Sequence, residues 1–142
     1  MSAPRSLRDA IPAGALLSRE DAQGIIEKVV KMSKAASINA QIGTNYAANV
    51  RFADNQMSTA GSVVDAGVAV QSAYGPKHAV VTTNDLSEAA LRRAVEQSEA
   101  LAKLAPDDPE SMPDLEPQRY QSVNGYMDQT ANVGAAERAQ AA

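Results

Sequence analysis

Asp54 and Asn55 are the feature that most constrains how this 142-residue chain can fold. Both residue types tolerate the positive φ that a tight hairpin turn requires. They stand between two runs that suit β-strands, Ala47–Ala53 before them and the stretch that leads to Val64–Gln71 after them. In Val64–Gln71 apolar residues take every second position, which is typical of a half-buried strand. The sequence therefore predicts a β-hairpin that turns at Asp54 and Asn55.

Further strands are expected on both sides of this hairpin. The alternation in residues 38–42 predicts a strand, and Gly43–Asn45 predicts a bend between it and the strand at 47–53. Gly75-Pro76 predicts another turn, after which His78–Thr83 returns as a strand. We expect a curved sheet of about four strands, antiparallel or mixed.

Two amphipathic helices are expected around the sheet. Ser18 is suited to cap the first, which should run to residues 35–36, and Asp85 with Glu88 has the spacing of a capping box for the second. The apolar positions recur at helical spacing. The predicted inward stripes are Ala22, Ile25, Ile26, Val29 and Val30 in the first helix, and Leu86, Ala90, Leu91, Ala94, Val95, Leu101 and Ala102 in the second.

The order of helix, strands and helix predicts an α+β fold with both helices on one face of the sheet. The other face should be small and flat, because Ala69, Ala73 and Ala79 accompany Gly67. Such a face suits another sheet or an extended peptide. The alternative is an ordinary solvated face.

The organisation along the chain follows from composition. We expect a flexible N-terminal tail at residues 1–16 and the α+β domain at residues 17–105. Pro106 should end the second helix and open a Pro-rich, acidic, extended linker at residues 106–120. Residues 121–142 read as the start of a following segment, in which residues 135–142 form the opening of an incomplete third helix.

Charge and composition exclude several partners. The formal net charge of −4 argues against nucleic acid, which is bound through Lys and Arg contacts to phosphates. No apolar run approaches the roughly 20 residues that span a bilayer, and no secretory signal is visible, so no membrane partner is expected. The chain has no Cys, which excludes a disulfide framework and fits a reducing, cytoplasmic location.

Three motifs resemble one protein family. The run Arg51–Gly61, RFADNQMSTAG, resembles the Arg-Phe-Ala-x-Asn motif of the TldD/PmbA family of metallopeptidases. Thr83–Val95 resembles that family's strand-to-helix junction, and Leu104–Pro113 with Glu116–Tyr120 resembles the linker of one branch. The resemblance covers residues 17–120 and implies the N-terminal portion of such a protein.

The resemblance implies a zinc peptidase that acts on peptides or partially unfolded proteins, as a homodimer or a heterodimer with another family member. It also implies that the zinc-binding His-Glu-x-x-x-His motif lies in a later domain. A hydrolytic zinc site needs about three protein ligands, and this chain has one His and no Cys. We therefore expect no catalytic residue, no metal ligand and no cofactor in this chain, and we interpret His78 as a strand-surface residue.

Two residues are candidates for contact with a substrate or partner. Arg51 could bind a peptide carboxylate or a neighbouring subunit, or it could simply pair with Asp54 on the surface. Asn55 could contribute to the same contact, or turn geometry alone could require it. We interpret Asp54, Asn84 and Asp85 as structural residues of a turn, a strand end and a helix cap.

The sequence leaves two functions open. The chain can be the non-catalytic scaffold and substrate-cleft portion of a TldD/PmbA-like zinc peptidase. Alternatively, it can be a stand-alone module that binds a peptide or a peptidase subunit without enzymatic activity.

Overall fold

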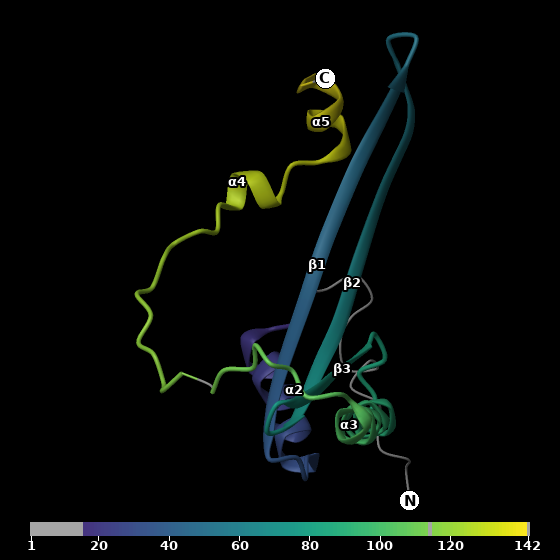
Figure 1. Cartoon of the computed structure of the whole chain (residues 1–142). Helices are drawn as coiled ribbons and strands as arrows, with labels where there is room; N and C mark the ends of the chain where they lie inside the picture. Colours follow the sequence, from purple (N-terminus) through teal and green to yellow (C-terminus); the bar gives the residue numbers. More distant parts are fainter. Residues whose placement is uncertain (1–15, 114, 142) are drawn as a thin grey trace, which may run out of the picture. The chain divides into compact units, whose positions relative to one another are not determined.

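The computed structural model describes residues 16–113 and 115–141 and has the expected α+β class (Figure 1). Most of the tail predicted at residues 1–16 lies outside these described residues. The helices and strands, in chain order, are α2 (Arg19–Met32), β1 (Ser37–Ala53), β2 (Gln56–Tyr74), β3 (Lys77–Thr83), α3 (Glu88–Leu104), α4 (Asp128–Ala131) and α5 (Ala135–Ala141).

The chain divides into two compact units. The first comprises the described parts of Met1–Tyr46 and Val64–Met112, and the second comprises Ala47–Val63 together with Pro113–Ala142. The helices α2 and α3, the strand β3 and the packed parts of β1 and β2 belong to the first unit. We call Ala47–Val63, the turn end of the hairpin, the arm.

In the part of the chain that the structure describes, the sheet has three strands in the order β1-β2-β3, where about four were expected. The predicted bend at Gly43–Asn45 is wrong, because β1 runs without interruption from Ser37 to Ala53. Half-buried Ile42 and Thr44 flank exposed Gly43, so the alternation of a strand continues through the glycine. A glycine in extended conformation weakens a strand but does not have to break it.

The hairpin turn has the predicted geometry. Asp54 has a φ of 50° and Asn55 a φ of 57°, both in the left-handed region. Positive φ at two consecutive residues is the mark of a two-residue hairpin turn that matches the twist of its strands. The second predicted turn also forms, with Gly75 at a φ of 61° between β2 and β3.

The antiparallel register of β2 and β3 separates the two faces of the sheet. Val70 pairs with Val81 and Ser72 with Ala79 on the face toward the helices, whereas Ala69 pairs with Thr82 on the opposite face. The prediction that Ala79 shares the second face with Ala69 is therefore wrong. We call this second face the outer face; on β2 and β3 it carries Gly67, Ala69, Gln71, Ala73, His78, Val80 and Thr82.

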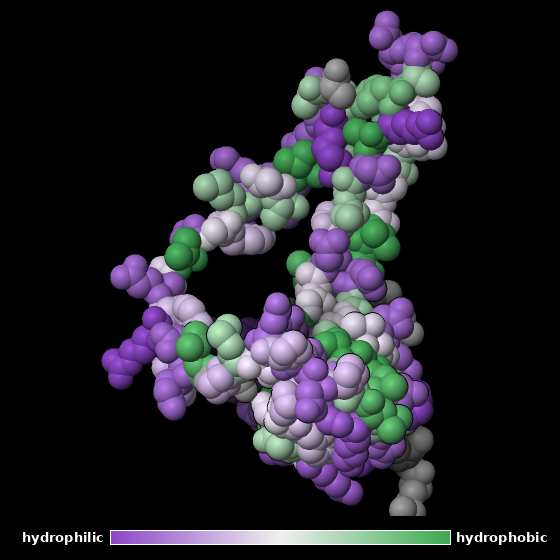
Figure 2. All heavy atoms as spheres, in the orientation of Figure 1, coloured by the Kyte–Doolittle hydropathy of each residue, from purple (hydrophilic) through white to green (hydrophobic). Residues whose placement is uncertain are grey.

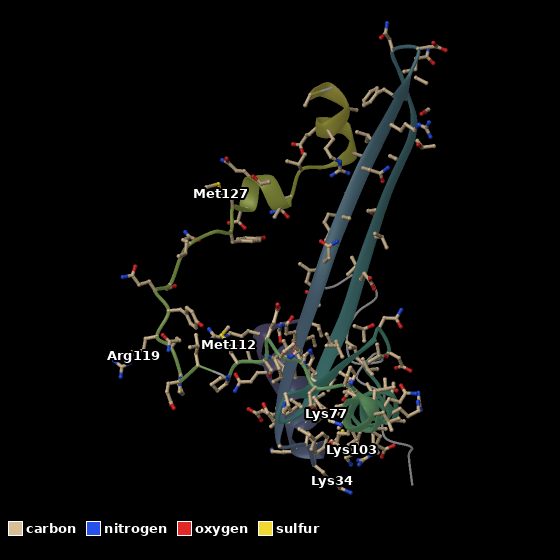
Figure 3. All side chains as sticks on the ribbon, in the orientation of Figure 1. Lys34, Lys77, Lys103, Met112, Arg119 and Met127 are labelled. Atoms are coloured by element: carbon tan, nitrogen blue, oxygen red, sulfur yellow. The ribbon has the colours of Figure 1, made fainter. Side chains whose placement is uncertain are left out.

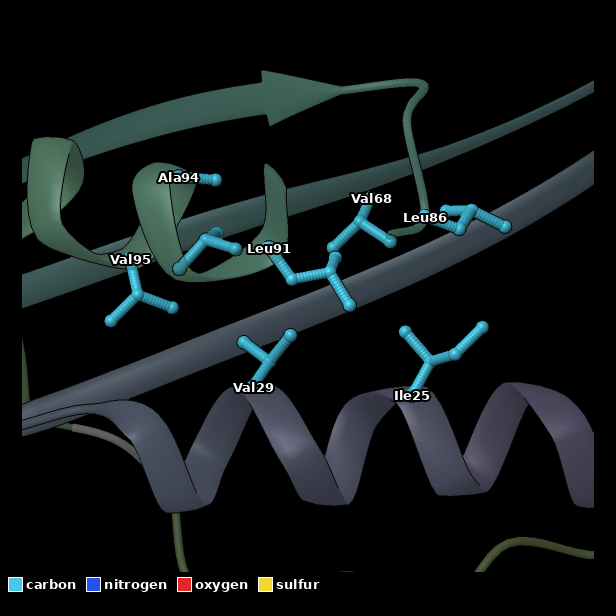
Figure 4. Packing of buried hydrophobic residues seen from close by; sticks show 8 residues of the cluster. Ile25, Val29, Val68, Leu86, Leu91, Ala94 and Val95 are labelled. Carbon is cyan, nitrogen blue, oxygen red and sulfur yellow. The ribbon is translucent and has the colours of Figure 1, made fainter. Parts of the chain in front are cut away.

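The core lies between the helices and the inner face of the sheet (Figure 4). Ser18 caps α2 as predicted, since its hydroxyl accepts the Asp21 N–H at 3.0 Å. The central cluster consists of Ile25, Val29, Val68, Val70, Leu86, Leu91, Ala94 and Val95. No aromatic side chain belongs to this cluster, so Val, Ile and Leu supply most of its buried area.

Two members of the predicted stripes are not inward. Val30 is 47% exposed, because it lies about 100° around α2 from the buried Val29. Leu101 is 51% exposed, because Ser98, Glu99 and Ala102 occupy the centre of the buried stripe in the last turns of α3. Helical periodicity of apolar residues predicted a core position for Leu101 and did not predict that the polar residues Ser98 and Glu99 are buried.

Helix α2 ends at Met32, three to four residues before the predicted end. The carboxylate of Glu99, on α3, accepts hydrogen bonds from the Ser33 hydroxyl at 2.9 Å, from the Lys34 N–H and from the Ala35 N–H at 3.1 Å. These backbone N–H groups would need carbonyl partners one turn earlier if the helix continued. A tertiary contact that the local sequence does not reveal therefore sets the end of α2.

Helix α3 begins differently from the prediction. Its N-cap is Ser87, whose hydroxyl accepts the Ala90 N–H at 3.3 Å, so no capping box forms from Asp85 to Glu88. Asp85 lies in the preceding turn, where its carboxylate accepts the Ser87 N–H at 2.9 Å and its own N–H donates to the Thr83 hydroxyl at 3.1 Å. Asp85 is thus not the N-cap of α3, but it orients the N-cap residue Ser87.

After α3 the described residues have no helix or strand until α4. The sequence did not predict α4, which has four residues, whereas α5 begins at Ala135 as expected. Over the ranges that the structure describes, no helix is long and apolar enough to cross a membrane.

Candidate functional site

The candidate site is an open groove on the outer face of the first unit, with a volume of about 640 Å³. All three strands contribute to it: β1 near Gly43, β2 from Asp65 to Ala69, and β3 at its C-terminal end. Because Val68 and Val70 are buried under the helices, the alternating residues Gly67 and Ala69 present the opposite side of β2 to the groove.

The floor of the groove is formed by the smallest side chains of the sheet. A Cβ atom added at Gly43 would meet no heavy atom within 4 Å, and one added at Gly67 would lie 3.6 Å from the Thr83 carbonyl oxygen. Neither glycine has the positive φ that would require it for conformational reasons. Because the two glycines have no side chains, another chain can approach the strand backbone closely at these positions.

The rim of the groove is polar and carries a negative charge. Gln41, Thr82 and Asn84 supply amide and hydroxyl groups, and Asp65 is the charged residue among those that line it. One carboxylate oxygen of Asp65 accepts the Ala66 N–H at 2.9 Å, and the residue is exposed. A negative group at an uncovered sheet face attracts a cationic group on a ligand.

Asn84 is a groove residue that the sequence analysis treated only as a strand end. It follows β3 directly and lies at the rim with Thr82. The signal available in the sequence was the set of small residues on β2, which did predict a flat second face. The contribution of Gly43 was missed because that glycine was interpreted as a bend.

Arg51, Asp54 and Asn55 lie in the arm, so the structure does not assign them to the groove, which belongs to the first unit. All three are exposed. In the part of the chain that the structure describes, Arg51 and Asp54 form no ion pair with each other. The Arg51 carbonyl oxygen accepts the Ser58 hydroxyl at 3.1 Å across the hairpin.

His78 does not fit a zinc site. Its Nδ1 lies 3.9 Å from a carboxylate oxygen of Asp108, and the two side chains are 39% and 37% exposed. Within the described ranges, no three or more His, Cys, Asp or Glu side chains gather closely enough to hold a metal ion. The donors present therefore do not match the three protein ligands of a hydrolytic zinc centre.

The buried polar groups of the first unit join α3 to its neighbours. Ser72 and Ser98 share a hydrogen bond of 2.7 Å between β2 and α3, and the Ser98 hydroxyl also lies 2.9 Å from the Val95 carbonyl. Glu99 is only 8% exposed. Both interactions lie on the helix side of the sheet, so they support the groove from below and do not contact a ligand in it.

The electrostatics of Glu99 favour its charged form. Burial raises the pKa of the Glu99 carboxyl, but the hydrogen bonds from Lys34, Ser33 and Ala35 outweigh burial and leave the pKa below its usual value. Lys103, labelled in Figure 3, adds a smaller effect in the same direction. Its ammonium nitrogen also lies 5.1 Å from the centroid of the Tyr74 ring, a cation–π contact.

Residues 42–102 match the family described as PmbA/TldA metallopeptidase domain 1. This stretch is similar to the first domain of the TldD/PmbA family. Two of the motifs noted in the sequence, Arg51–Gly61 and Thr83–Val95, lie within this TldD/PmbA match, and the linker motif lies after it. Nearly all of the groove is also built from matched residues, from Ile42 to Asn84.

A solved structure supports the same fold. The crystal structure of TldE from Thermococcus kodakarensis aligns with 80% of this chain at a TM-score of 0.61 and 16% sequence identity. The alignment covers 25% of the TldE chain, so this chain spans about a quarter of that protein's length. A search of curated proteins finds no match.

Proposed function

We propose that this chain is the non-catalytic N-terminal scaffold and substrate-cleft portion of a TldD/PmbA-like zinc metallopeptidase that acts on peptides in the cytoplasm. The family match supports the lineage, and the description of that family as metallopeptidases supports the activity. The described residues hold no zinc site. We expect zinc and the hydrolytic residues to lie in a further domain of a longer protein.

The groove is the observation that carries the substrate-cleft role. It is open, it lies on the sheet face opposite α2 and α3, and Gly43 and Gly67 contribute no side chain to its floor. An extended peptide can approach such a floor closely and use the amides and hydroxyls at the rim for its own backbone groups.

The proposal is tested by the longer product of the same reading frame. We expect that product to contain His-Glu-x-x-x-His and to hydrolyse an unfolded peptide in a manner that a chelator abolishes and zinc restores. The 142-residue chain alone should show no hydrolysis. A reading frame that continues without this motif, or a product inactive with zinc, would contradict the proposal.

The arm favours a second candidate, a module that binds another subunit. Phe52 and Met57 in the arm are 37% and 50% exposed, and Val63 is 58% exposed. Figure 2 shows hydrophobic residues recurring among hydrophilic ones along the hairpin. A two-stranded hairpin with exposed apolar side chains is only marginally stable alone. We propose that a second copy of the chain or another family member covers the exposed apolar side chains of the arm. This contact would include Arg51 and Asn55 at the turn.

This subunit proposal predicts self-association or capture of a family member through the arm. In sedimentation velocity, Phe52→Ser with Met57→Ser should shift the complex to monomer with unchanged thermal unfolding, because neither residue belongs to the core. Ala48→Ser, also in the arm but small, is the matched control and should leave association intact. Association that persists in the double variant would rule the arm out as the contact.

A further inference from the structure

We infer that the groove on the outer face selects an extended peptide with a basic side chain opposite Asp65. This inference rests on the proposed function, because it names the class of peptide that the same groove would hold. It concerns residues of the first unit only, so it does not depend on the arm.

The dimensions of the groove suit a strand of peptide. Its volume of about 640 Å³ lies within the range of roughly 300–1,000 Å³ that is common for ligand sites. Gly43 and Gly67 contribute no side chain to its floor. Gln41 and Asn84 each offer both a donor and an acceptor, which matches the alternating C=O and N–H groups of an extended backbone.

Another segment of the chain contacts this face near the turn between β2 and β3. The Asp108 N–H donates to the Pro76 carbonyl at 3.1 Å, and the Asp108 carboxylate lies 3.9 Å from His78. His78 pairs with Ala73 and therefore belongs to the outer face. At this end, a segment without secondary structure is held by a backbone hydrogen bond and a side chain of complementary character. The groove likewise offers strand backbone together with one polar side chain, Asp65.

The charge of the groove decides between classes of peptide. Asp65 carries the charge among the lining residues, and none of the Lys and Arg residues that the structure describes lines the groove. The whole chain is also acidic, with a formal net charge of −4. An acidic peptide would therefore meet repulsion from both sources, whereas a Lys or Arg side chain would meet attraction. Because Asp65 is exposed, the attraction is modest and falls with salt.

The test uses fluorescence anisotropy with three labelled eight-residue peptides that differ only at one central position, which is Lys, Gln or Glu. We expect affinity for the 142-residue chain to fall in the order Lys, Gln, Glu. Asp65→Asn should weaken binding of the Lys peptide about 2- to 5-fold and bring it close to the Gln peptide, as for an exposed ion pair. Raising the salt should reduce the difference among the peptides.

Gly43→Phe separates groove binding from binding elsewhere. The added side chain meets open space and needs no strained φ, so it should fill the groove and leave thermal unfolding intact. We expect it to weaken all three peptides at least about 10-fold. Gly24→Ala, on α2, also adds a Cβ in open space and should leave the affinity for all three peptides unchanged. Unchanged affinity in Gly43→Phe, or equal affinity for the Lys and Glu peptides, would overturn the inference.

A second copy of the chain in the groove would also overturn it. In that case, sedimentation would show a dimer that Gly43→Phe dissociates and that the peptides do not displace. Failure of the proposed function gives a different result. A longer product without zinc-dependent hydrolysis would contradict the peptidase role, but the preference for the Lys peptide in binding could still be measured. Equal hydrolysis of all three peptides, with no preference in binding, would contradict only the present inference.

Discussion

Replacement of Glu99 by Ala should lower the free energy of unfolding by about 3 kcal/mol at pH 7. The carboxylate accepts one hydroxyl and two backbone hydrogen bonds from the segment that follows α2, and it is only 8% exposed. Removing a charged acceptor leaves partly buried N–H groups without their partner, at a cost of about 1–3 kcal/mol each before relaxation to water. Urea denaturation of the two proteins measures the difference.

The same contact predicts an acid-dependent stability. The pKa of Glu99 is lower in the folded chain than its ordinary value of 4.5, so the unfolded chain binds more protons and stability rises with pH through this range. The contribution of Glu99 is fully present above the ordinary pKa and is lost as the pH falls through the folded pKa. The stability gap between the wild-type chain and Glu99→Ala should thus be constant from pH 7 to about pH 5.5 and shrink below about pH 4.

Glu96 provides the matched control for Glu99. It lies on the exposed side of the same helix. Glu96→Ala should therefore change the free energy of unfolding by less than about 0.5 kcal/mol, both at pH 7 and at pH 3.5. A gap between the wild-type chain and Glu99→Ala that stays the same at pH 3.5 would show that the charge of the carboxylate is not what holds the end of α2.

Local chemistry made parts of the fold predictable. The positive φ at Asp54 and Asn55, the cap at Ser18 and the alternation in β2 each depend on a few neighbouring residues. The end of α2 could not be predicted, because it depends on Glu99, more than sixty residues away in sequence. Gly43 was misread because a glycine in a strand and a glycine in a bend look alike until the strand partners are known.

The candidate site was predictable only in part. Gly67 and Ala69 indicated a flat second face, but the groove also needs Gly43 from β1 and Asn84 after β3, which only the pairing of the strands brings together. The family motif identified the lineage through Arg51–Gly61, although those residues lie in the arm and outside the groove. A motif that identifies a family need not mark the place where a ligand binds.

Leu91 and Leu101 give the sharpest test of where α3 packs. Leu91 is fully buried in the cluster with Ile25, Val29 and Val68, and a buried Leu→Ala change typically costs about 2–5 kcal/mol through lost burial and the cavity left behind. We expect about 3 kcal/mol for Leu91→Ala in urea denaturation, with an unchanged dependence on urea concentration.

Leu101→Ala is the matched control, because it removes the same atoms from the same helix. Leu101 is 51% exposed, so the expected loss is below about 0.5 kcal/mol. The periodicity of the sequence treats the two leucines as equivalent, whereas the structure places Ser98, Glu99 and Ala102 at the centre of the buried stripe. Equal losses for the two variants would mean that α3 is rotated from this position, and the contacts of Glu99 with the end of α2 could not then form.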